Sequence, residues 1–385
     1  MKYKLKDIFD LQMGKTPARN NQNYWNTKEN KWISIADLSK TGKYISTTKE
    51  YLSDAAVEES GIKVIPANTV VMSFKLSIGK TAITTEEMYS NEAIMAFHDR
   101  RVVDILPEYV FYMFKYRNWE EGSNKAVMGK TLNKAILSDV EIEICPIEKQ
   151  REIVAVLDKL MAVLEHREDE LQLLDKLIKA RFVEMFGTLD NPSQEFVKAT
   201  LKELCNKITD GKHGGCKAEE GTERYFVGAR EIYDDEVHYD TAPEINIDEF
   251  EKDYKRCNIE IGDFLIVNTG ATIGKSAIAT DKRTKHTLLQ KSVALLKVKK
   301  DVLNPVFLKW CYRVNKQMYI VESASAQPNL LLSKINSTVI YVPDIELQNQ
   351  FASFVEQVDK SKVEVQKALD ETQKLFDSLM QQYFG

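Results

Sequence analysis

The chain has 385 residues, of which 43 % are hydrophobic and 29 % are charged, a composition typical of soluble globular proteins. It exceeds the usual size of one domain, and its formal net charge of −5 excludes a uniformly basic surface. No apolar run approaches the roughly 18 residues of a membrane span, no signal peptide is predicted, and the five cysteines lack metal or disulfide spacing, so we expect a cytoplasmic protein without membrane attachment.

Residues 1–145 are predicted to form a first globular domain. Short β-like runs are broken by Gly, Asn and Pro, and one helical piece is expected at Pro107–Arg117. Within residues 1–49, 10 side chains are basic and 4 are acidic. Such a patch suits contacts to phosphate, although solvated faces of proteins that bind nothing carry similar patches.

Residues 146–187 are predicted to form one long helix. Ten positions from Ile153 to Met185, including Arg167 and Arg181, follow alternating steps of four and three residues, and eight of them are apolar. A sustained heptad stripe is typical of a coiled-coil seam. The seam residues that we single out in this helix are Leu157, Leu160, Leu164, Leu171 and Leu174.

The second half of the chain repeats the first at an offset of 195 to 198 residues. The clearest match pairs Ser77–Ile83 (SIGKTAI) with Thr272–Ile278 (TIGKSAI), after a joint at Asn191-Pro-Ser193. Residues 188–343 are therefore predicted to form a second globular domain of the same kind, with a helical piece at Pro305–Asn315. Its basic side chains concentrate in residues 275–300, which contain 8 basic residues and one acidic residue.

The stretch Asn268–Ile278 resembles a phosphate-binding loop at first sight, because Gly274 is followed by Lys275 and Ser276. The motif requires four residues between its glycines, whereas Gly270 and Gly274 enclose three. A phosphate loop also opens a helix, whereas β-like runs flank this stretch in both copies. We therefore predict a strand, a turn and a second strand, with no nucleotide site.

Residues 344–385 are predicted to form a second long helix with the same stripe, in which Lys362 and Thr372 are the polar positions. Burying both stripes is simplest if the two helices pair antiparallel within one chain; a coiled coil between chains is the alternative. The two helical segments also carry the acidic excess of the chain, with 7 basic against 9 acidic residues and 4 against 8. The seam residues that we single out here are Val355, Val358, Val365, Leu369 and Phe376.

No catalytic constellation is recognisable in the sequence. There is no H-E-x-x-H, no G-x-S-x-G and no Cys–His pair, and the five histidines are dispersed. We therefore expect a non-catalytic protein without a metal site. A coiled-coil scaffold with two protein-binding domains and no DNA role is the alternative function, and it would lack the steep salt dependence of phosphate contacts.

The duplicated order of β-rich domain and long helix resembles the specificity subunit of type I restriction–modification systems. Thr209–Gly214 (TDGKHG) is similar to the Asp-Gly-Thr-His loop of that family, with Lys212 where Thr is usual, and Met13–Pro17 (MGKTP) is similar to a variant of it. Trp32–Leu38 and Phe226–Ile232 look like the strand that follows, and Leu174–Gly187 is also similar to a family pattern. The duplicated order of these motifs is more specific than any one of them.

This resemblance implies an α+β fold with two target recognition domains separated by two long antiparallel coiled-coil helices, related by a pseudo-twofold internal duplication. Each domain would read one half of a bipartite site in double-stranded DNA. The helices would set the gap, at most about 17 base pairs for a helix of about 58 Å, and dock two modification (methyltransferase) subunits. Restriction (translocase–nuclease) subunits would join that complex. S-adenosylmethionine and ATP are expected in those partners and no cofactor in this chain.

The resemblance and the basic patches together suggest which side chains lie at the DNA. In the first domain they are Lys15, Thr16, Arg19, Lys75 and Lys80. In the second domain they are Lys212, His213, Arg230, Lys275, Arg283 and Lys285.

Overall fold

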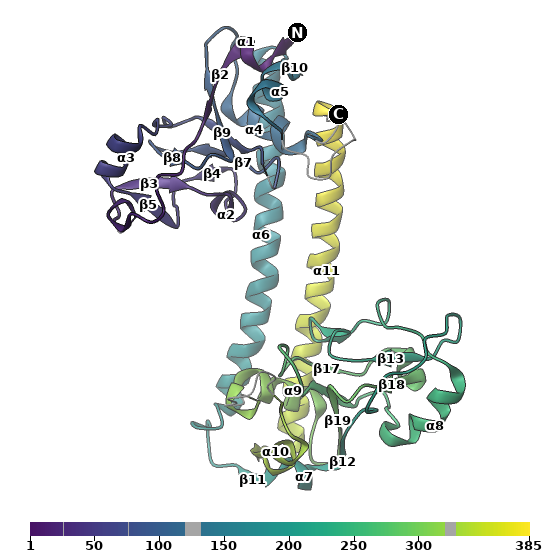
Figure 1. The fold of residues 1–385 in the computed structure, drawn as a ribbon. Coiled ribbons are helices and arrows are strands. Elements are labelled where there is room, and N and C mark those ends of the chain that lie inside the picture. The colour runs from purple at the N-terminus through teal and green to yellow at the C-terminus, as the bar shows by residue number, and fades with distance from the viewer. Residues whose placement is uncertain (26, 76, 120–131, 320–328) are drawn as a thin grey trace. The chain divides into compact units, whose positions relative to one another are not determined.

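The computed structural model describes residues 1–25, 27–75, 77–119, 132–319 and 329–385. The chain forms two compact units, one made of Met1–Glu168 with Lys367–Gly385 and the other of Asp169–Gln366. Each unit contains one globular domain and part of each of the two long helices, α6 (Ile147–Phe186) and α11 (Ile345–Phe384) (Figure 1). The division into segments 1–145, 146–187, 188–343 and 344–385 stays a prediction.

The first unit is built on a five-stranded sheet with the strand order β2-β9-β6-β7-β4. A three-stranded sheet, β5-β3-β8, and the pair β1-β10 complete its β structure. The strands are β1 (Lys2–Lys4), β2 (Phe9–Met13), β3 (Asn30–Ile33), β4 (Tyr44–Ile45), β5 (Glu50–Leu52), β6 (Val70–Ser73), β7 (Thr81–Thr84), β8 (Tyr89–Ser90), β9 (Ile94–Asp99) and β10 (Glu141–Glu143). The short helices are α1 (Leu5–Ile8), η1 (Gln22–Tyr24), α2 (Ile35–Leu38), α3 (Asp54–Ser60), α4 (Pro107–Tyr116) and α5 (Lys134–Asp139).

The second unit repeats this plan around a four-stranded sheet with the order β12-β19-β16-β17. The pairs β13-β18, β14-β15 and β11-β20 surround it. The strands are β11 (Val197–Thr200), β12 (Cys205–Asp210), β13 (Tyr225–Val227), β14 (Ile232–Tyr233), β15 (Glu236–Val237), β16 (Phe264–Val267), β17 (Ser276–Ile278), β18 (Thr287–Leu289), β19 (Val293–Val298) and β20 (Val339–Val342). The short helices are α7 (Leu201–Leu204), α8 (Ile247–Cys257), η2 (Lys282–His286), α9 (Pro305–Val314), η3 (Lys316–Met318) and α10 (Leu332–Ser337).

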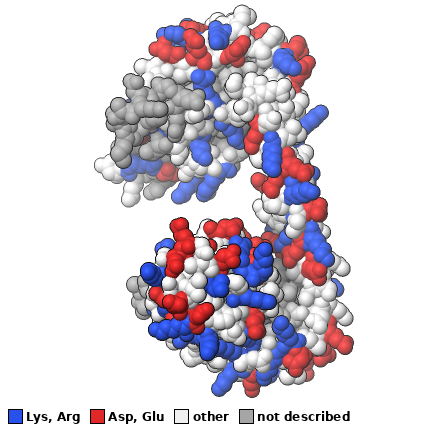
Figure 2. All heavy atoms as spheres, turned by 90° about the vertical axis from the view of Figure 1, so that its right-hand side faces the viewer, with Lys and Arg blue, Asp and Glu red and all other residues white. Residues whose placement is uncertain are grey.

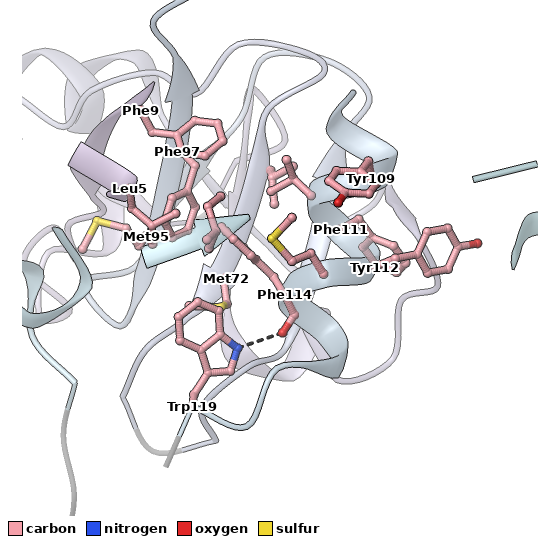
Figure 3. Close-up of a cluster of buried hydrophobic side chains, with 14 of the residues drawn as sticks. Leu5, Phe9, Met72, Met95, Phe97, Tyr109, Phe111, Tyr112, Phe114 and Trp119 are labelled. Atoms are coloured by element: carbon pink, nitrogen blue, oxygen red, sulfur yellow. Dashed lines mark hydrogen bonds between the residues drawn. The ribbon is translucent and has the colours of Figure 1, made fainter. Parts of the chain in front are cut away.

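Alternate side chains of a strand point to opposite faces of its sheet. In both main sheets each face is covered by its own hydrophobic core. In β6, Val70 and Met72 enter the core shared with α4, whereas Val71 enters a second core with Ile33. Aromatic side chains of α4 pack on the first of these cores, and Trp119 closes one end of it by donating from Nε1 to the Phe114 carbonyl oxygen at 2.8 Å (Figure 3). β16 divides its side chains between two cores in the same way.

The prediction of a strand, a turn and a second strand at both Gly-Lys-Ser/Thr stretches is confirmed. β6 pairs antiparallel with β7, and β16 pairs antiparallel with β17. Gly79 and Gly274 have φ values of 86° and 90°, a left-handed conformation that glycine adopts without strain. Leu76, in the first of these turns, lies outside the described residues. The two helical pieces that begin at Pro107 and Pro305 are likewise confirmed as α4 and α9.

The two long helices run antiparallel within each unit. In the first unit, Leu157 near the start of α6 shares a core with Phe376 near the end of α11. In the second unit, Phe182 near the end of α6 contacts Phe351 near the start of α11, with ring centroids 5.3 Å apart. Of the ten seam residues, four are buried (Leu157, Val355, Val358 and Phe376) and six are half-buried (Leu160, Leu164, Leu171, Leu174, Val365 and Leu369).

One predicted seam position is wrong. The four–three spacing places Arg181 on the stripe, but this side chain is exposed and pairs with Glu184 at 2.8 Å. Phe182 is fully buried in its place, against Phe186 and Phe307 of the domain core. A straight helix drifts by about 20° per heptad relative to a 3.5-residue repeat, so the buried position moves by one residue where the helix meets its domain.

Candidate nucleic-acid interface

Three loops of the first domain meet at the connection between β8 and β9. The loop after β2 is held by the amides of Gly14 and Lys15, which donate to the carbonyl oxygens of Ile94 at 3.1 Å and Ser90 at 2.8 Å. The β6 end is held by the amide of Phe74, which donates to the Ala93 oxygen at 2.9 Å. The β3 end is held by a bond of 3.1 Å from the Asn91 amide to the Ile33 oxygen. We call these loops, with residues 90–93, the first loop cluster.

The second domain reproduces this arrangement bond for bond. The amides of Gly211 and Lys212 donate to the carbonyl oxygens of Val293 at 3.2 Å and Leu289 at 2.7 Å. The Asn268 amide donates to Ser292 at 3.0 Å, and the Gln290 amide donates to Val227 at 2.8 Å. The loops that follow β12, β13 and β16 therefore meet residues 289–292, and we call this set the second loop cluster.

A glycine is required where the first loop of each cluster crosses the connection. A Cβ atom on Gly14 would lie 2.2 Å from the Asn91 oxygen, and one on Gly211 would lie 2.1 Å from the Leu289 oxygen. Because both neighbours are backbone atoms, neither can move aside without moving the chain that carries it. These glycines are the ones in the Met-Gly-Lys-Thr-Pro and Asp-Gly-Lys-His motifs.

Lys15 and Thr16 lie in the first loop cluster. The Lys15 ammonium donates to the carbonyl oxygen of Ser60, and its chain is exposed. The Thr16 hydroxyl donates to the carboxylate of Glu92, which belongs to the β8–β9 connection. Both side chains, which the sequence analysis predicted at the DNA, are thus held by neighbours within the same domain.

Arg19 follows in the same loop and lies among aromatic rings. Its guanidinium carbon is 3.8 Å from the centre of the Trp25 ring and 4.7 Å from that of Trp32, and the group forms an ion pair with Glu50. The two rings hold the guanidinium in place, and the Glu50 carboxylate is its charged partner.

Lys75 and Lys80 lie on the connection between β6 and β7. Lys75 is half-buried, with its ammonium 5.2 Å from the centre of the Phe74 ring. Lys80 is exposed, and no ion pair to it occurs among the described residues. Its charge is available to a ligand.

Lys212 lies in the second loop cluster but is not a free cation. Its ammonium pairs with Asp253 at 2.8 Å and Glu249 at 3.3 Å, and its side chain is 18 % exposed. The bond to Asp253 does most to raise the pKa of Lys212. The adjacent His213 is exposed and contacts Asp210 at 3.2 Å.

Arg283 and Lys285 lie outside the cluster. Both belong to η2, which precedes β18, whereas the cluster lies at the other end of that strand. Arg283 pairs with Asp281 at 2.8 Å and Asp240 at 3.0 Å. Lys285 is exposed. Proximity in the basic run 275–300 therefore does not place these residues beside Lys275.

The second loop cluster has its own unpaired cations. Arg230 after β13, Lys275 after β16 and Lys291 before β19 are all exposed, and within the described part of the chain none forms an ion pair. Figure 2 shows that positive and negative side chains are interspersed over one face of the second unit.

The sequence analysis singled out neither Glu92 nor Lys291, which both lie in the loop clusters. The available signal was the repeat itself, because each residue stands two positions before a buried strand, in Glu92-Ala-Ile94 and Lys291-Ser-Val293. Among the described residues there is no group of three or more potential metal ligands, and no helix is long and apolar enough to cross a bilayer.

Known proteins share this architecture and sequence pattern. The family model for the type I restriction modification DNA specificity domain matches residues 1–174 and again residues 193–373. The specificity subunit of type I restriction enzyme MjaIX from Methanocaldococcus jannaschii is 24 % identical over 98 % of this chain and 90 % of its own length.

Two solved structures have the same fold. The S subunit of the type I restriction–modification system from M. genitalium aligns over 100 % of this chain and 96 % of its own, with a TM-score of 0.56 and 15 % identity. A chain from a structural study of assembly and conformational transition of the type I R-M system aligns over 100 % and 97 %, with a TM-score of 0.64 and 17 % identity. Since the family model covers most of the chain in two copies, this chain belongs to the type I restriction–modification DNA specificity family.

Proposed function

We propose that this DNA specificity subunit reads a bipartite target in double-stranded DNA, with one loop cluster on each half-site. The observation that carries the proposal is the duplication of the cluster, in which the same four backbone hydrogen bonds hold corresponding loops in both units. Two similar but non-identical readers on one chain suit two different half-sites. The globular segments 1–145 and 188–343 would be the target recognition domains.

The available basic and polar side chains would fix each domain on the phosphate backbone. Lys15, Thr16, Lys75 and Lys80 would act in the first domain, and Arg230, Lys275 and His213 in the second. Lysine and arginine contacts to phosphate position a protein without reading sequence. Arg19, Lys212 and Arg283 already have carboxylate partners, so we assign them a smaller share of that attraction, and Lys285 would contact DNA away from the cluster.

The helical segments 146–187 and 344–385 would set the gap between half-sites and dock the partner subunits. The subunit itself is non-catalytic. We propose that two modification subunits supply methyl transfer with S-adenosylmethionine and that restriction subunits supply ATP-driven translocation and cleavage. This chain would need no cofactor and would act in the cytoplasm.

The decisive test is the sequence methylated by the complex. The chain is produced with its modification partner in a host without other methylation, and the modified sites are read by genome sequencing. We expect a split motif whose two parts are separated by a fixed gap. A single contiguous motif, or no motif with an active partner, would contradict the proposal.

Lengthening both helices is expected to lengthen the gap. Seven residues are inserted between Glu168 and Asp169 and seven between Gln366 and Lys367, at the boundaries of the compact units. A heptad keeps the apolar stripe in register and adds about 10 Å of helix, so the gap should grow by about three base pairs. Both half-site sequences should stay the same.

The matched control places seven residues between Glu220 and Gly221, in an exposed turn of the second domain. This insertion should leave the gap as it is. An unchanged gap after insertion into both helices would refute the spacer role while leaving the reading of half-sites intact.

A further inference from the structure

Glu92 and Lys291 occupy the same position in the two loop clusters. Glu92 follows Asn91, whose amide donates to the carbonyl oxygen of Ile33 at the end of β3. Lys291 follows Gln290, whose amide donates to the carbonyl oxygen of Val227 at the end of β13. Glu92 precedes Ala93, whose carbonyl oxygen accepts from the Phe74 amide after β6. Lys291 precedes Ser292, whose carbonyl oxygen accepts from the Asn268 amide after β16. Both side chains are exposed. The backbone is thus matched, while the side chains have opposite charges.

Glu92 is held as an ionised acceptor. Asn91 Oδ1 accepts from the amide of Ala93 at 3.0 Å and fixes the turn that carries Glu92. The hydrogen bond from Thr16 lowers the pKa of the Glu92 carboxyl, with Lys75 and Arg19 adding to the effect. Of the five residues predicted at the DNA in this domain, Thr16 therefore bonds to this carboxylate, and the charges of Lys75 and Arg19 act on it.

A carboxylate in this place is poorly suited to the phosphate backbone. It repels phosphate and weakens the attraction that the neighbouring cations provide. It can accept a hydrogen bond from an amino group on a base edge, and in the major groove the amino group of cytosine is the usual partner of Glu. Thr16 uses only one of the acceptor sites that the carboxylate offers.

Lys291 offers the opposite chemistry. Its amide donates to the carbonyl oxygen of Lys212 at 3.0 Å, which fixes its backbone against the first loop of the cluster. The ammonium of Lys212 is taken by Asp253 and Glu249. Lys291 has no ion pair among the described residues, and its ammonium has donors only, as O6 and N7 of guanine require.

We infer that Glu92 and Lys291 are specificity-determining residues at corresponding positions of the two half-sites. Glu92 accepts from the amino group of a cytosine in the half-site of the first domain. Lys291 donates to a guanine in the half-site of the second. This assignment rests on the proposed function and names which base edges the two clusters meet.

The test uses the full chain with its modification partner and compares methylated motifs. Glu92→Lys should change the preference at one position of the first half-site from cytosine to guanine, with methylation of the original site reduced about tenfold or more. Glu92→Gln keeps an oxygen for Thr16 and should shift the same position toward adenine. Lys291→Glu should shift one position of the second half-site from guanine to cytosine.

Glu87→Lys is the matched control, because Glu87 is an exposed carboxylate in the same domain outside the cluster. It makes the same charge change and should leave both half-sites unaltered. If Glu92→Lys or Glu92→Gln alters the methylation rate at every site without changing a base preference, Glu92 only positions Thr16 and the inference is wrong. A wild-type complex without a split motif would instead overturn the proposed function.

Discussion

Replacing Gln348 with leucine is expected to lower the free energy of unfolding of the second unit by about 3 kcal/mol or more. Gln348 is fully buried in the first turn of α11, where its Oε1 accepts from the Asn304 amide at 2.9 Å. Its Nε2 donates to the carbonyl oxygens of Val302 at 3.0 Å and Pro343 at 2.7 Å. Leucine would leave three backbone groups without these partners, at about 1 kcal/mol for each of the two part-buried groups (Asn304 and Val302) and up to about 3 kcal/mol for the buried Pro343 oxygen.

The measurement is amide hydrogen exchange across α9 and the start of α11, which reports on the second unit separately. Gln357→Leu is the matched control, since it makes the same exchange at an exposed position of the same helix and should change stability by no more than about 0.5 kcal/mol. Equal exchange rates in the two variants would show that the side-chain bonds of Gln348 contribute little.

Gln150 makes the corresponding bonds in the first unit. Its Oε1 accepts from the Leu106 amide, and its Nε2 donates to the carbonyl oxygens of Asp104 and Cys145, all at 2.9 Å. In each unit one glutamine thus joins the start of the long helix to the loop that precedes α4 or α9. The two glutamines stand at the same place in a duplicated sequence, Ile147-Glu-Lys-Gln150 and Ile345-Glu-Leu-Gln348. From sequence alone, however, a polar residue within a helix is predicted to be exposed, because its hydrogen-bond partners are unknown.

The fold was predictable where the pattern is local or repeated. The apolar spacing of the long helices and the strands that flank Gly79 and Gly274 depend on neighbouring residues, and duplication supplies an independent second reading of each. The shift of the buried seam position from Arg181 to Phe182 was not predictable in this way. It depends on contacts of Phe182 with Phe307 and Phe351, which come from distant parts of the chain.

The site was predictable only in outline. The glycine motifs mark the first loop of each cluster, because a close backbone approach requires a glycine in the sequence. Whether a basic side chain is free of an ion pair depends on which acidic residues the fold places beside it. Asp253 of α8, for example, lies beside Lys212. Glu92 was overlooked because an acidic residue argues against phosphate contacts, although a base edge can require one.

Gly211→Ala is expected to abolish sequence reading by the second loop cluster while the first half-site is still recognised. The added Cβ would lie 2.1 Å from the Leu289 oxygen and 2.3 Å from the Gln290 oxygen, so the loop must separate from the β18–β19 connection. That separation breaks the bond from Lys212 to Leu289 and displaces Lys291, with a loss of about 1 to 3 kcal/mol in stability.

Gly215→Ala is the matched control, because no described atom lies within 4 Å of a Cβ at that position, in the same loop. Methylome sequencing of the complex should give the original split motif for Gly215→Ala. For Gly211→Ala it should give a motif in which only the second half is degraded, and Gly14→Ala should degrade only the first half. Because the two glycines lie in separate units, loss of both half-sites from one substitution would mean that the clusters do not read independently, and an unaltered motif would mean that the loop does not contact the bases.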